Sequence, residues 1–453
     1  MRITPLQSKI ALYQDGFEKH DLLNRKVIGG QLTDLVTKVE EPLVVAIDGA
    51  WGSGKSFFLK CWVGELAKSA QDTATIVYFD AFENDYLDDP FVSLTSMLAE
   101  RLKGADDQGK LSSKAAAGLK KILAPAARIA IAAATTGVSE ILAPILSGAL
   151  GAAGSEANEQ IEKLWNVEAS RRQAMSDFRA SLEALAELDD EGKPTKRVIF
   201  VVDELDRCRP DYALQTLEVM KHFFSVAGVH FVLGANLEEL MNSVRARYGD
   251  RVDARTYLEK FVSVSMRLPE AIDQPGRSRP AATVYFREMS TRMALPEKIV
   301  EGVIRWQDNF DGLQFRSIRQ SQKVLTEIAL IPNKDNVLDR LYFGWNQTLT
   351  ALILLKHLEP DRFNRLRRNK LSYREMAEFL DLDRAGSEDL RETKLAQYIW
   401  RCILAPDLVV DEDGLRNVWG GWGRERLGEL IPTLLRDYID PIVVVEELLS
   451  PKP

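Results

Sequence analysis

The chain has 453 residues, enough for two to four domains, and its 45% hydrophobic and 28% charged residues are typical of a folded protein. The net charge of -8 argues against a positive potential over the whole surface that would attract nucleic acid, although a local basic face is compatible with this charge. The three cysteines lie far apart and the four histidines have no metal-ligand spacing, so neither a disulfide framework nor a histidine or zinc site is expected.

The opening residues, MRITPLQSKIALYQDG, lack the basic-then-apolar order and the small-residue cleavage site of a signal peptide. Cysteines without paired spacing are typical of a reducing compartment. We therefore expect a cytoplasmic protein, and membrane association is the alternative.

The first strong motif is VVAIDGAWGSGKSFF, residues 44–58. It begins with a short apolar, β-branched run typical of a buried parallel strand, and helical periodicity follows Ser56. Between them, residues 49–56 fit the pattern GxxxxGK[ST] of a phosphate-binding loop, or P-loop. The order strand, loop and helix predicts a cradle for nucleotide phosphates, and a glycine-rich turn without a ligand is the alternative.

Each residue type in the P-loop has a physical reason. Glycines adopt backbone angles that side chains forbid, so the N–H groups of the loop can converge on phosphate oxygens at the helix N-terminus. Lys55 would reach the β- and γ-phosphates, and the Ser56 hydroxyl would coordinate Mg²⁺. The expected nucleotide-binding residues are Gly49, Trp51, Gly52, Ser53, Gly54, Lys55, Ser56 and Phe57.

A long interval precedes the next motif, and we place a helical, apolar insertion at residues 103–190. Residues 123–155 are rich in alanine and glycine, but Arg128 and Glu140 divide them into pieces shorter than the roughly 20 apolar residues of a spanning helix. We favour a small-residue helical hairpin that packs on the core or self-associates. A membrane hairpin and a lipid-contacting or partner-docking element are the alternatives.

The second motif, KRVIFVVDELDRC, is an apolar strand that ends at Asp203 and Glu204. Carboxylates at the carboxyl end of a parallel strand lie where ligands bind in open α/β sheets. We assign Asp203 to Mg²⁺ and Glu204 to the general base that polarises the attacking water. Capping of the following helix is the alternative for either acid.

A third strand is expected at residues 228–236, GVHFVLGAN, which Asn236 ends. The Asn236 amide can orient water near the γ-phosphate, cap the helix that follows, or do both.

Both motifs resemble those of the KAP P-loop NTPases. The family loop reads GxWGSGK[ST], with Trp51 in place here, and the family's second motif is similar to VIFVVDELDRC. The segments that begin at Asp21, Ile76 and Tyr248 resemble further family elements, and the first of these contributes to the nucleotide pocket. Phe82 stands where the family usually has tryptophan.

The resemblance covers residues 15–330 and implies an α/β fold. Its parts would be a P-loop NTPase core built on a parallel sheet, a helical insertion, a helical lid and an all-α C-terminal domain. It implies ATP and Mg²⁺ as cofactors, and ATP over GTP rests on it alone. Many relatives place membrane hairpins in the interval of the insertion, and some act in bacterial defence against phage.

Arg207 can hold Asp206 bidentately and organise the loop beside the phosphates, or it can face the nucleotide of a second subunit. We favour the first arrangement. An arginine that stabilises transition-state charge would come from a set of four candidates: Arg245, Arg247, Arg251 and Arg255.

The segment LQFRSIRQSQKVL resembles the Asn-Pro-Arg-x-x-Lys-Arg element of the family's helical lid. Arg316 falls on the first arginine, Arg319 falls on the lysine position, and Phe315 replaces the proline. Arg316 is expected to contact the γ-phosphate and couple the lid to the nucleotide state. A surface arginine on an amphipathic helix is the alternative.

Beyond residue 331 the pattern is strongly helical. The basic segment RFNRLRRNK can contact nucleic-acid phosphates, but we favour a solvated helix face. We expect a core at residues 1–270, a lid at residues 271–335 and a helical C-terminal domain at residues 336–453.

The expected function is that of an ATP-binding, Mg²⁺-dependent switch or remodelling ATPase. Its catalytic residues would be Lys55, Glu204, Asn236 and Arg316. A protein partner or a second copy of the chain would receive the conformational change. The alternatives are a nucleotide-gated scaffold with little turnover, a membrane-associated signalling protein, and a kinase for which no acceptor motif is visible.

Overall fold

The computed structural model describes residues 10–70, 72–87, 89–106, 155–223, 225–274, 277–382, 391–405, 412–420 and 429–439. Nearly all of the apolar stretch at 123–155 lies outside these residues, so the predictions made for it are untested. Among the helices of the described residues, none combines the length and apolarity that crossing a membrane requires.

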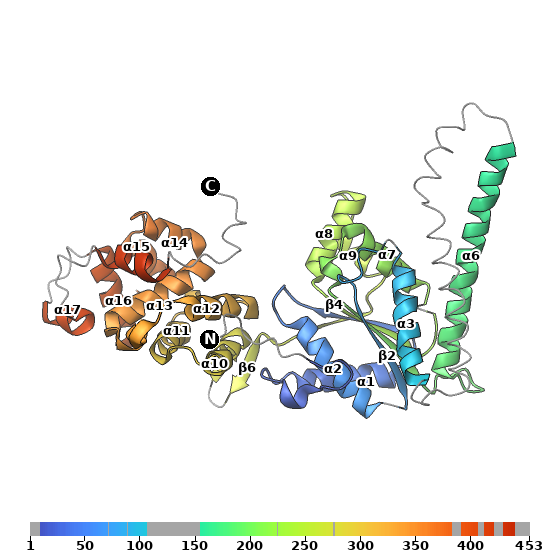
Figure 1. Ribbon diagram of the computed structural model, residues 1–453, viewed down its shortest axis with the longest axis horizontal. Coiled ribbons are helices and arrows are strands. Elements are labelled where there is room, and N and C mark those ends of the chain that lie inside the picture. Colours follow the sequence, from blue (N-terminus) through green and yellow to red (C-terminus); the bar gives the residue numbers. More distant parts are fainter. Residues whose placement is uncertain are drawn as a thin grey trace.

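A five-stranded parallel sheet forms the centre of the first half of the chain (Figure 1). The strand order is β2-β3-β4-β1-β5, so β4 separates the strand before the P-loop from the strand that carries Asp203. The predicted fold class is confirmed, and all three predicted strands are present. The strands are β1 (Leu43–Asp48), β2 (Ala74–Asp80), β3 (Arg197–Asp203), β4 (Val229–Ala235) and β5 (Val264–Arg267).

Helices cover both faces of this sheet because successive side chains of a strand point to opposite faces. On β1, Val45 and Ile47 pack with α1 and α2, whereas Val44 and Ala46 belong to the cluster of the other face. The helices of this half are α1 (Lys26–Lys38), α2 (Lys55–Ser69), α3 (Pro90–Asp106), α6 (Ser155–Ala186), α7 (Pro210–Lys221), α8 (Leu237–Tyr248) and α9 (Ala254–Leu258).

Helix α2 buries the apolar stripe that its sequence predicts. Five apolar residues at helical spacing are fully buried: Phe58, Leu59, Trp62, Val63 and Leu66. Helix α6 packs Phe178 and Leu182 into the cluster on the opposite face of the sheet. The P-loop is therefore anchored at both ends, by a buried strand before it and a buried helix after it.

The second half of the chain is helical and follows a short antiparallel hairpin. Its helices share one hydrophobic cluster that runs from Ala282 to Ile439 and therefore crosses the boundary expected near residue 335. The hairpin strands are β6 (Ala271–Gln274) and β7 (Arg277–Pro280). The helices are α10 (Ala281–Arg292), α11 (Glu297–Asn309), α12 (Ile318–Leu330), α13 (Phe343–Leu358), α14 (Pro360–Arg367), α15 (Tyr373–Phe379), α16 (Arg391–Leu404), α17 (Glu412–Trp419) and α18 (Leu430–Leu434).

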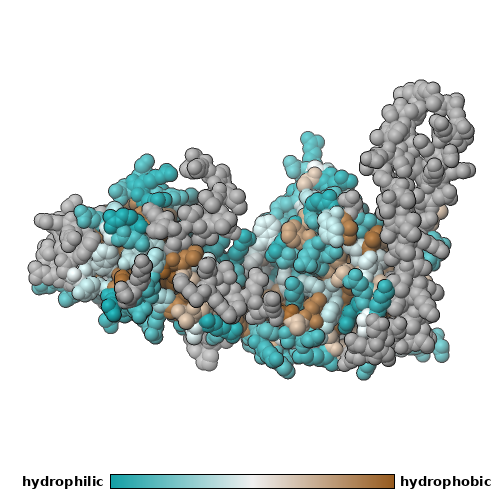
Figure 2. All heavy atoms as spheres, in the orientation of Figure 1, coloured by the Kyte–Doolittle hydropathy of each residue, from teal (hydrophilic) through white to brown (hydrophobic). Residues whose placement is uncertain are grey.

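Hydrophilic residues cover most of the described surface on the face shown in Figure 2, with smaller hydrophobic areas between them. The basic segment on α14 is partly neutralised. Arg365 pairs with Glu375, and Arg362 lies over the Phe379 ring. These contacts agree with a solvated helix face at this position.

Candidate functional site

The residues singled out from the two main motifs meet at the carboxyl edge of the sheet. In the register of the parallel sheet, Asp203 of β3 is the partner of Asp80 on β2 and of Gly234 on β4. Helix α2 begins at Lys55, directly after the P-loop. A cavity of about 270 Å³ lies between the P-loop, the turn after β3 and helix α12. Its lining includes Gly52, Gly54, Lys55, Ser56, Phe57, Asp203, Glu204, Asp206, Arg207, Ile318 and Gln322.

Two of the three P-loop glycines have left-handed backbone. The φ angles are 82° at Gly52 and 86° at Gly54, which is also the N-cap residue of α2, and side chains strain such a backbone. Gly49 has a different reason: a Cβ there would lie 3.0 Å from Ser53 Oγ. The backbone thus favours glycine at Gly52 and Gly54, whereas a side chain at residue 49 would require Ser53 to shift.

Lys55 places a cation inside the cavity. Its Nζ donates to the main-chain oxygens of Gly49 and Ala50, at 2.5 and 3.3 Å. Burial lowers the pKa of Lys55, and the nearby carboxylates of Asp206 and Asp203 act in the opposite direction. A cation held mainly by loop carbonyls can transfer its hydrogen bonds to a phosphate oxygen at little structural cost.

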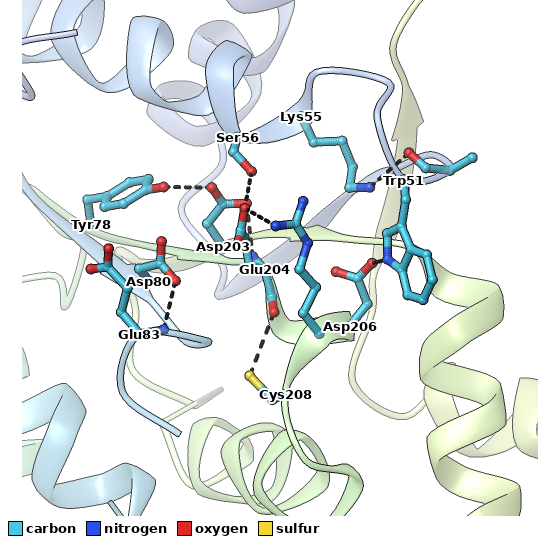
Figure 3. A network of polar contacts seen from close by, with 12 residues as sticks. Trp51, Lys55, Ser56, Tyr78, Asp80, Glu83, Asp203, Glu204, Asp206 and Cys208 are labelled. Atoms are coloured by element: carbon cyan, nitrogen blue, oxygen red, sulfur yellow. Dashed lines mark hydrogen bonds and ion pairs between the residues drawn. The ribbon is translucent and has the colours of Figure 1, made fainter. Parts of the chain in front are cut away.

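Asp203 is a buried carboxylate with a tyrosine partner (Figure 3). The Tyr78 hydroxyl donates to Asp203 Oδ2 at 2.6 Å, and Asp203 is 1% exposed. Burial raises the pKa of Asp203 to about 6, although hydrogen bonds from Tyr78 and Ser56 lower it. Sequence reasoning missed Tyr78; the available signal was a lone tyrosine within an apolar strand.

Ser56 and Asp203 fit a magnesium ion. Both offer hard oxygen donors, which Mg²⁺ prefers, and Mg²⁺ usually takes only one or two ligands from the protein. In the described part of the chain, no group of three or more His, Cys, Asp or Glu side chains could hold a metal ion. A metal bound here would therefore share its remaining ligands with water or phosphate.

Glu204 has an unusual backbone, with φ at 57° in the left-handed region. Its Oε1 accepts a hydrogen bond from Ser56 Oγ at 3.1 Å and pairs with Arg207 Nη1 at 2.9 Å. The expected Asp206–Arg207 pair is therefore wrong. The physical reason is the 3₁₀ turn Leu205–Arg207, which brings residues three apart in sequence onto the same side.

Asp206 instead reaches the P-loop. Its Oδ2 accepts a 2.7 Å hydrogen bond from the indole Nε1–H of Trp51 (Figure 3). The turn after β3 is thus joined to the P-loop twice, through Trp51 and through Ser56.

A second residue missed by sequence reasoning is Arg25, in the segment that begins at Asp21. Its guanidinium is buried and donates to the main-chain oxygens of Ser53 and Gly54, at 2.8 and 3.2 Å. Burial lowers the pKa of Arg25 to about 10, against the opposing effect of Asp21. Because N–H groups of a P-loop face the phosphates, its carbonyls face away and need donors from behind.

Asn236 acts as a helix cap. Its side chain accepts from the Glu238 N–H at 3.1 Å and begins α8. It lines a second, larger cleft of about 1270 Å³, together with Asp48 at the end of β1 and Gly49 of the P-loop. The capping prediction is confirmed, and the role in orienting water stays a prediction.

Arg316 lines the larger cleft and not the cavity beside Lys55. Its guanidinium pairs with Glu359 at 2.8 Å, and its side chain is 66% exposed. Arg319, the second residue of α12, lies against the P-loop: a Cβ built on Gly52 would meet Arg319 Cβ at 2.6 Å. Ser317 caps α12, so Arg316 precedes the helix and Arg319 belongs to its first turn.

The four other arginine candidates lie on or near α8 and α9. Arg245 bonds to Asn242 Oδ1, and Arg255 pairs with Glu259 at 3.6 Å with its side chain 83% exposed. Of the four, Arg245 and Arg255 line the larger cleft and not the cavity beside Lys55.

Comparison with known proteins identifies a family. A model of the KAP family P-loop domain matches residues 25–332. No curated protein matches the chain. Among solved structures, the Aeropyrum pernix ORC2 protein in its ADPNP-ADP complexes has 13% identity and a TM-score of 0.36, over 91% of this chain and 86% of that chain.

The AMPPCP-bound DnaA from Aquifex aeolicus has 9% identity and a TM-score of 0.27, over 94% of this chain and 92% of that chain. TM-scores this low describe only a distant likeness. The family match covers more than half of the chain.

Proposed function

Because the chain belongs to the KAP family of P-loop NTPases, we propose that it binds ATP with Mg²⁺ at residues 49–56 and hydrolyses it to drive a conformational switch. One observation carries the proposal: Lys55, Ser56, Asp203 and Glu204 line a single cavity, although they come from two distant motifs. The choice of ATP over GTP rests on the family resemblance.

The reaction follows from the positions of these side chains. The P-loop N–H groups and Lys55 would hold the β- and γ-phosphates, with Ser56 and Asp203 available to Mg²⁺. When bound, Mg²⁺ neutralises charge that develops on the phosphate oxygens. A water oxygen then attacks the γ-phosphorus, and the bond to the β–γ bridging oxygen breaks. Glu204 accepts the proton of the water, and ADP and phosphate leave.

The output would be a change in the position of α12. This helix begins against Gly52 and packs into the cluster of the helical half, so it connects the nucleotide to the rest of the chain. In this proposal Arg316 leaves Glu359 to reach the γ-phosphate, and Asn236 orients the attacking water. The lid at residues 271–335 moves on nucleotide binding and on product release.

A nucleotide-gated scaffold with little turnover is the main rival. Phosphate release distinguishes the two. Wild type should exceed the background set by Lys55→Ala, and Glu204→Gln should lower the rate by about 10²- to 10⁴-fold, the usual contribution of a general base. Equal, near-background rates in wild type and Glu204→Gln would support the scaffold and contradict the ATPase.

A role in bacterial defence against phage rests on the resemblance alone. Infection of cells that carry the wild-type gene or its Lys55→Ala variant tests it. Protection that depends on Lys55 is expected, and equal phage yields would contradict the role.

A further inference from the structure

Arg207 lies inside the cavity that would receive the γ-phosphate. It lines this cavity together with Gly52, Gly54 and Lys55 of the P-loop. Burial lowers the pKa of Lys55, and the positive charge of Arg207 acts in the same direction, as expected for two neighbouring cations. The cavity thus holds two cations from different elements, of which the hydrolysis scheme above uses only Lys55.

The partner of Arg207 is the expected general base. Arg207 Nη1 lies 2.9 Å from Glu204 Oε1, the same oxygen that accepts the Ser56 hydroxyl. The two contacts occupy Glu204 Oε1, so this oxygen has to lose a partner before it can accept a hydrogen bond from a water molecule.

The Arg207 guanidinium can leave Glu204 for another anion. The side chain of Glu204 is 17% exposed but that of Arg207 is 45% exposed, so the guanidinium can leave the carboxylate without unpacking a buried side chain. In the main chain of the turn, the Arg207 N–H donates a 3.0 Å hydrogen bond to the main-chain oxygen of Glu204. The exchange therefore requires movement of the Arg207 side chain alone. A γ-phosphoryl group carries more negative charge than a carboxylate and matches the two-pronged guanidinium.

We infer that Arg207 changes partner when a nucleoside triphosphate enters: its guanidinium leaves Glu204 and binds the γ-phosphoryl oxygens. This inference rests on the proposed function. The exchange frees the Glu204 carboxylate to accept the proton of the attacking water and places a positive charge where transition-state charge spreads. The same chain thus supplies the cation that other NTPases take from a partner.

The decisive experiment measures binding without turnover. In the Glu204→Gln background, the dissociation constants of Mg-ATP and Mg-ADP are determined with and without Arg207→Gln. We expect ATP affinity to fall about tenfold or more, while ADP affinity changes less than about twofold, since ADP lacks the γ-phosphoryl group. Equal losses for the two nucleotides, or no loss, would overturn the inference while leaving the ATP site intact.

Two further measurements sharpen this test. With Glu204 present, Arg207→Gln should lower kcat by about 10³-fold, in the range measured for arginine fingers. A higher kcat would mean that Arg207 only restrains Glu204 and would contradict the inference. Arg207→Lys keeps the charge without the two-pronged geometry, so we expect a kcat between those of wild type and Arg207→Gln.

Arg209→Gln is the matched control. Arg209 is exposed, follows in the same turn and bonds to the main-chain oxygen of Asp85 at 2.7 Å, outside the cavity. Its substitution should leave the preference for ATP over ADP unchanged. If Glu204→Gln binds neither nucleotide, the proposed function itself fails, together with this inference.

Discussion

The indole Nε1–H of Trp51 donates a 2.7 Å hydrogen bond to Asp206 Oδ2, across 155 positions of sequence. This bond fastens the P-loop to the turn that presents Glu204. The tryptophan of this P-loop thus has a structural role: it holds the P-loop and the turn that carries Glu204 next to each other.

The first prediction concerns this bond. Trp51→Phe retains an aromatic ring but removes the donor, and because Trp51 is 43% exposed we expect a loss of about 1 kcal/mol, or roughly fivefold, in kcat/KM for ATP. Steady-state phosphate release measures it. Asp206→Ala should cost a similar amount, and the double variant should cost less than the sum. Additive losses would show that the two side chains act separately.

A second prediction concerns Arg25, which supports the P-loop from behind. Arg25→Gln removes the charged donor to the Ser53 and Gly54 carbonyls, so we expect ATP and ADP affinities to fall together by about tenfold or more. Arg25→Lys keeps the charge but cannot reproduce the fork geometry, and should recover only part of the loss. Titration with both nucleotides measures these effects.

Lys26→Gln is the control for Arg25, because Lys26 is its neighbour and pairs with Glu65 at the surface. We expect nucleotide affinity to remain within about twofold of wild type, since surface pairs contribute little. Equal effects of Arg25→Gln and Lys26→Gln would argue that Arg25 does not shape the loop.

A third prediction follows from the raised pKa of Asp203. The pKa is about 6 in the folded chain against the usual 3.8 of an aspartate, so between these pH values the folded state holds a proton that the unfolded state has already lost. The free energy of unfolding therefore falls as the pH rises from about 4 to about 6. Above pH 6 this group has removed ~3 kcal/mol of stability from the nucleotide-free protein.

Asp203→Asn removes this penalty. Without nucleotide or metal, the variant should be more stable than wild type by up to ~3 kcal/mol at pH 7.5 and about equal at pH 4, because the wild-type carboxyl is protonated there. Urea unfolding at the two pH values measures the difference. The same gain in the free energy of unfolding at both pH values would contradict the view that ionisation of Asp203 destabilises the folded protein. The variant should also lose its response to Mg²⁺.

Sequence reasoning succeeded where local chemistry determines structure. The P-loop pattern, the strand before it and the buried face of α2 depend on residues close together in the chain, and all three are present. The capping box at Ser372 and Glu375, which begins α15, is another structure that depends on residues close together in the chain. Fold class followed from these elements because the motif order restricts the possible sheets.

It failed where the answer depends on tertiary structure. Tyr78 reaches Asp203 only because β2 lies next to β3, and Arg25 reaches the P-loop from the position just before α1. The partner of Arg207 depends on the left-handed backbone of Glu204, which glutamate rarely adopts and which no neighbouring residue signals. Arg316 precedes α12 and pairs with Glu359, and its contact with the γ-phosphate stays a prediction.

The most direct test of the account is the binding of Mg-ATP to purified wild type and to Lys55→Ala, measured by calorimetric titration. Lys55 lines the cavity beside the P-loop, and its Nζ donates to main-chain oxygens of the loop. The substitution by alanine therefore removes the main cation of the proposed phosphate site. We expect saturable binding of one nucleotide by wild type and a loss of at least about 100-fold in affinity in Lys55→Ala, the cost of one strong charged contact or more. Equal affinities in the two proteins would contradict the assignment of residues 49–56 as the nucleotide site.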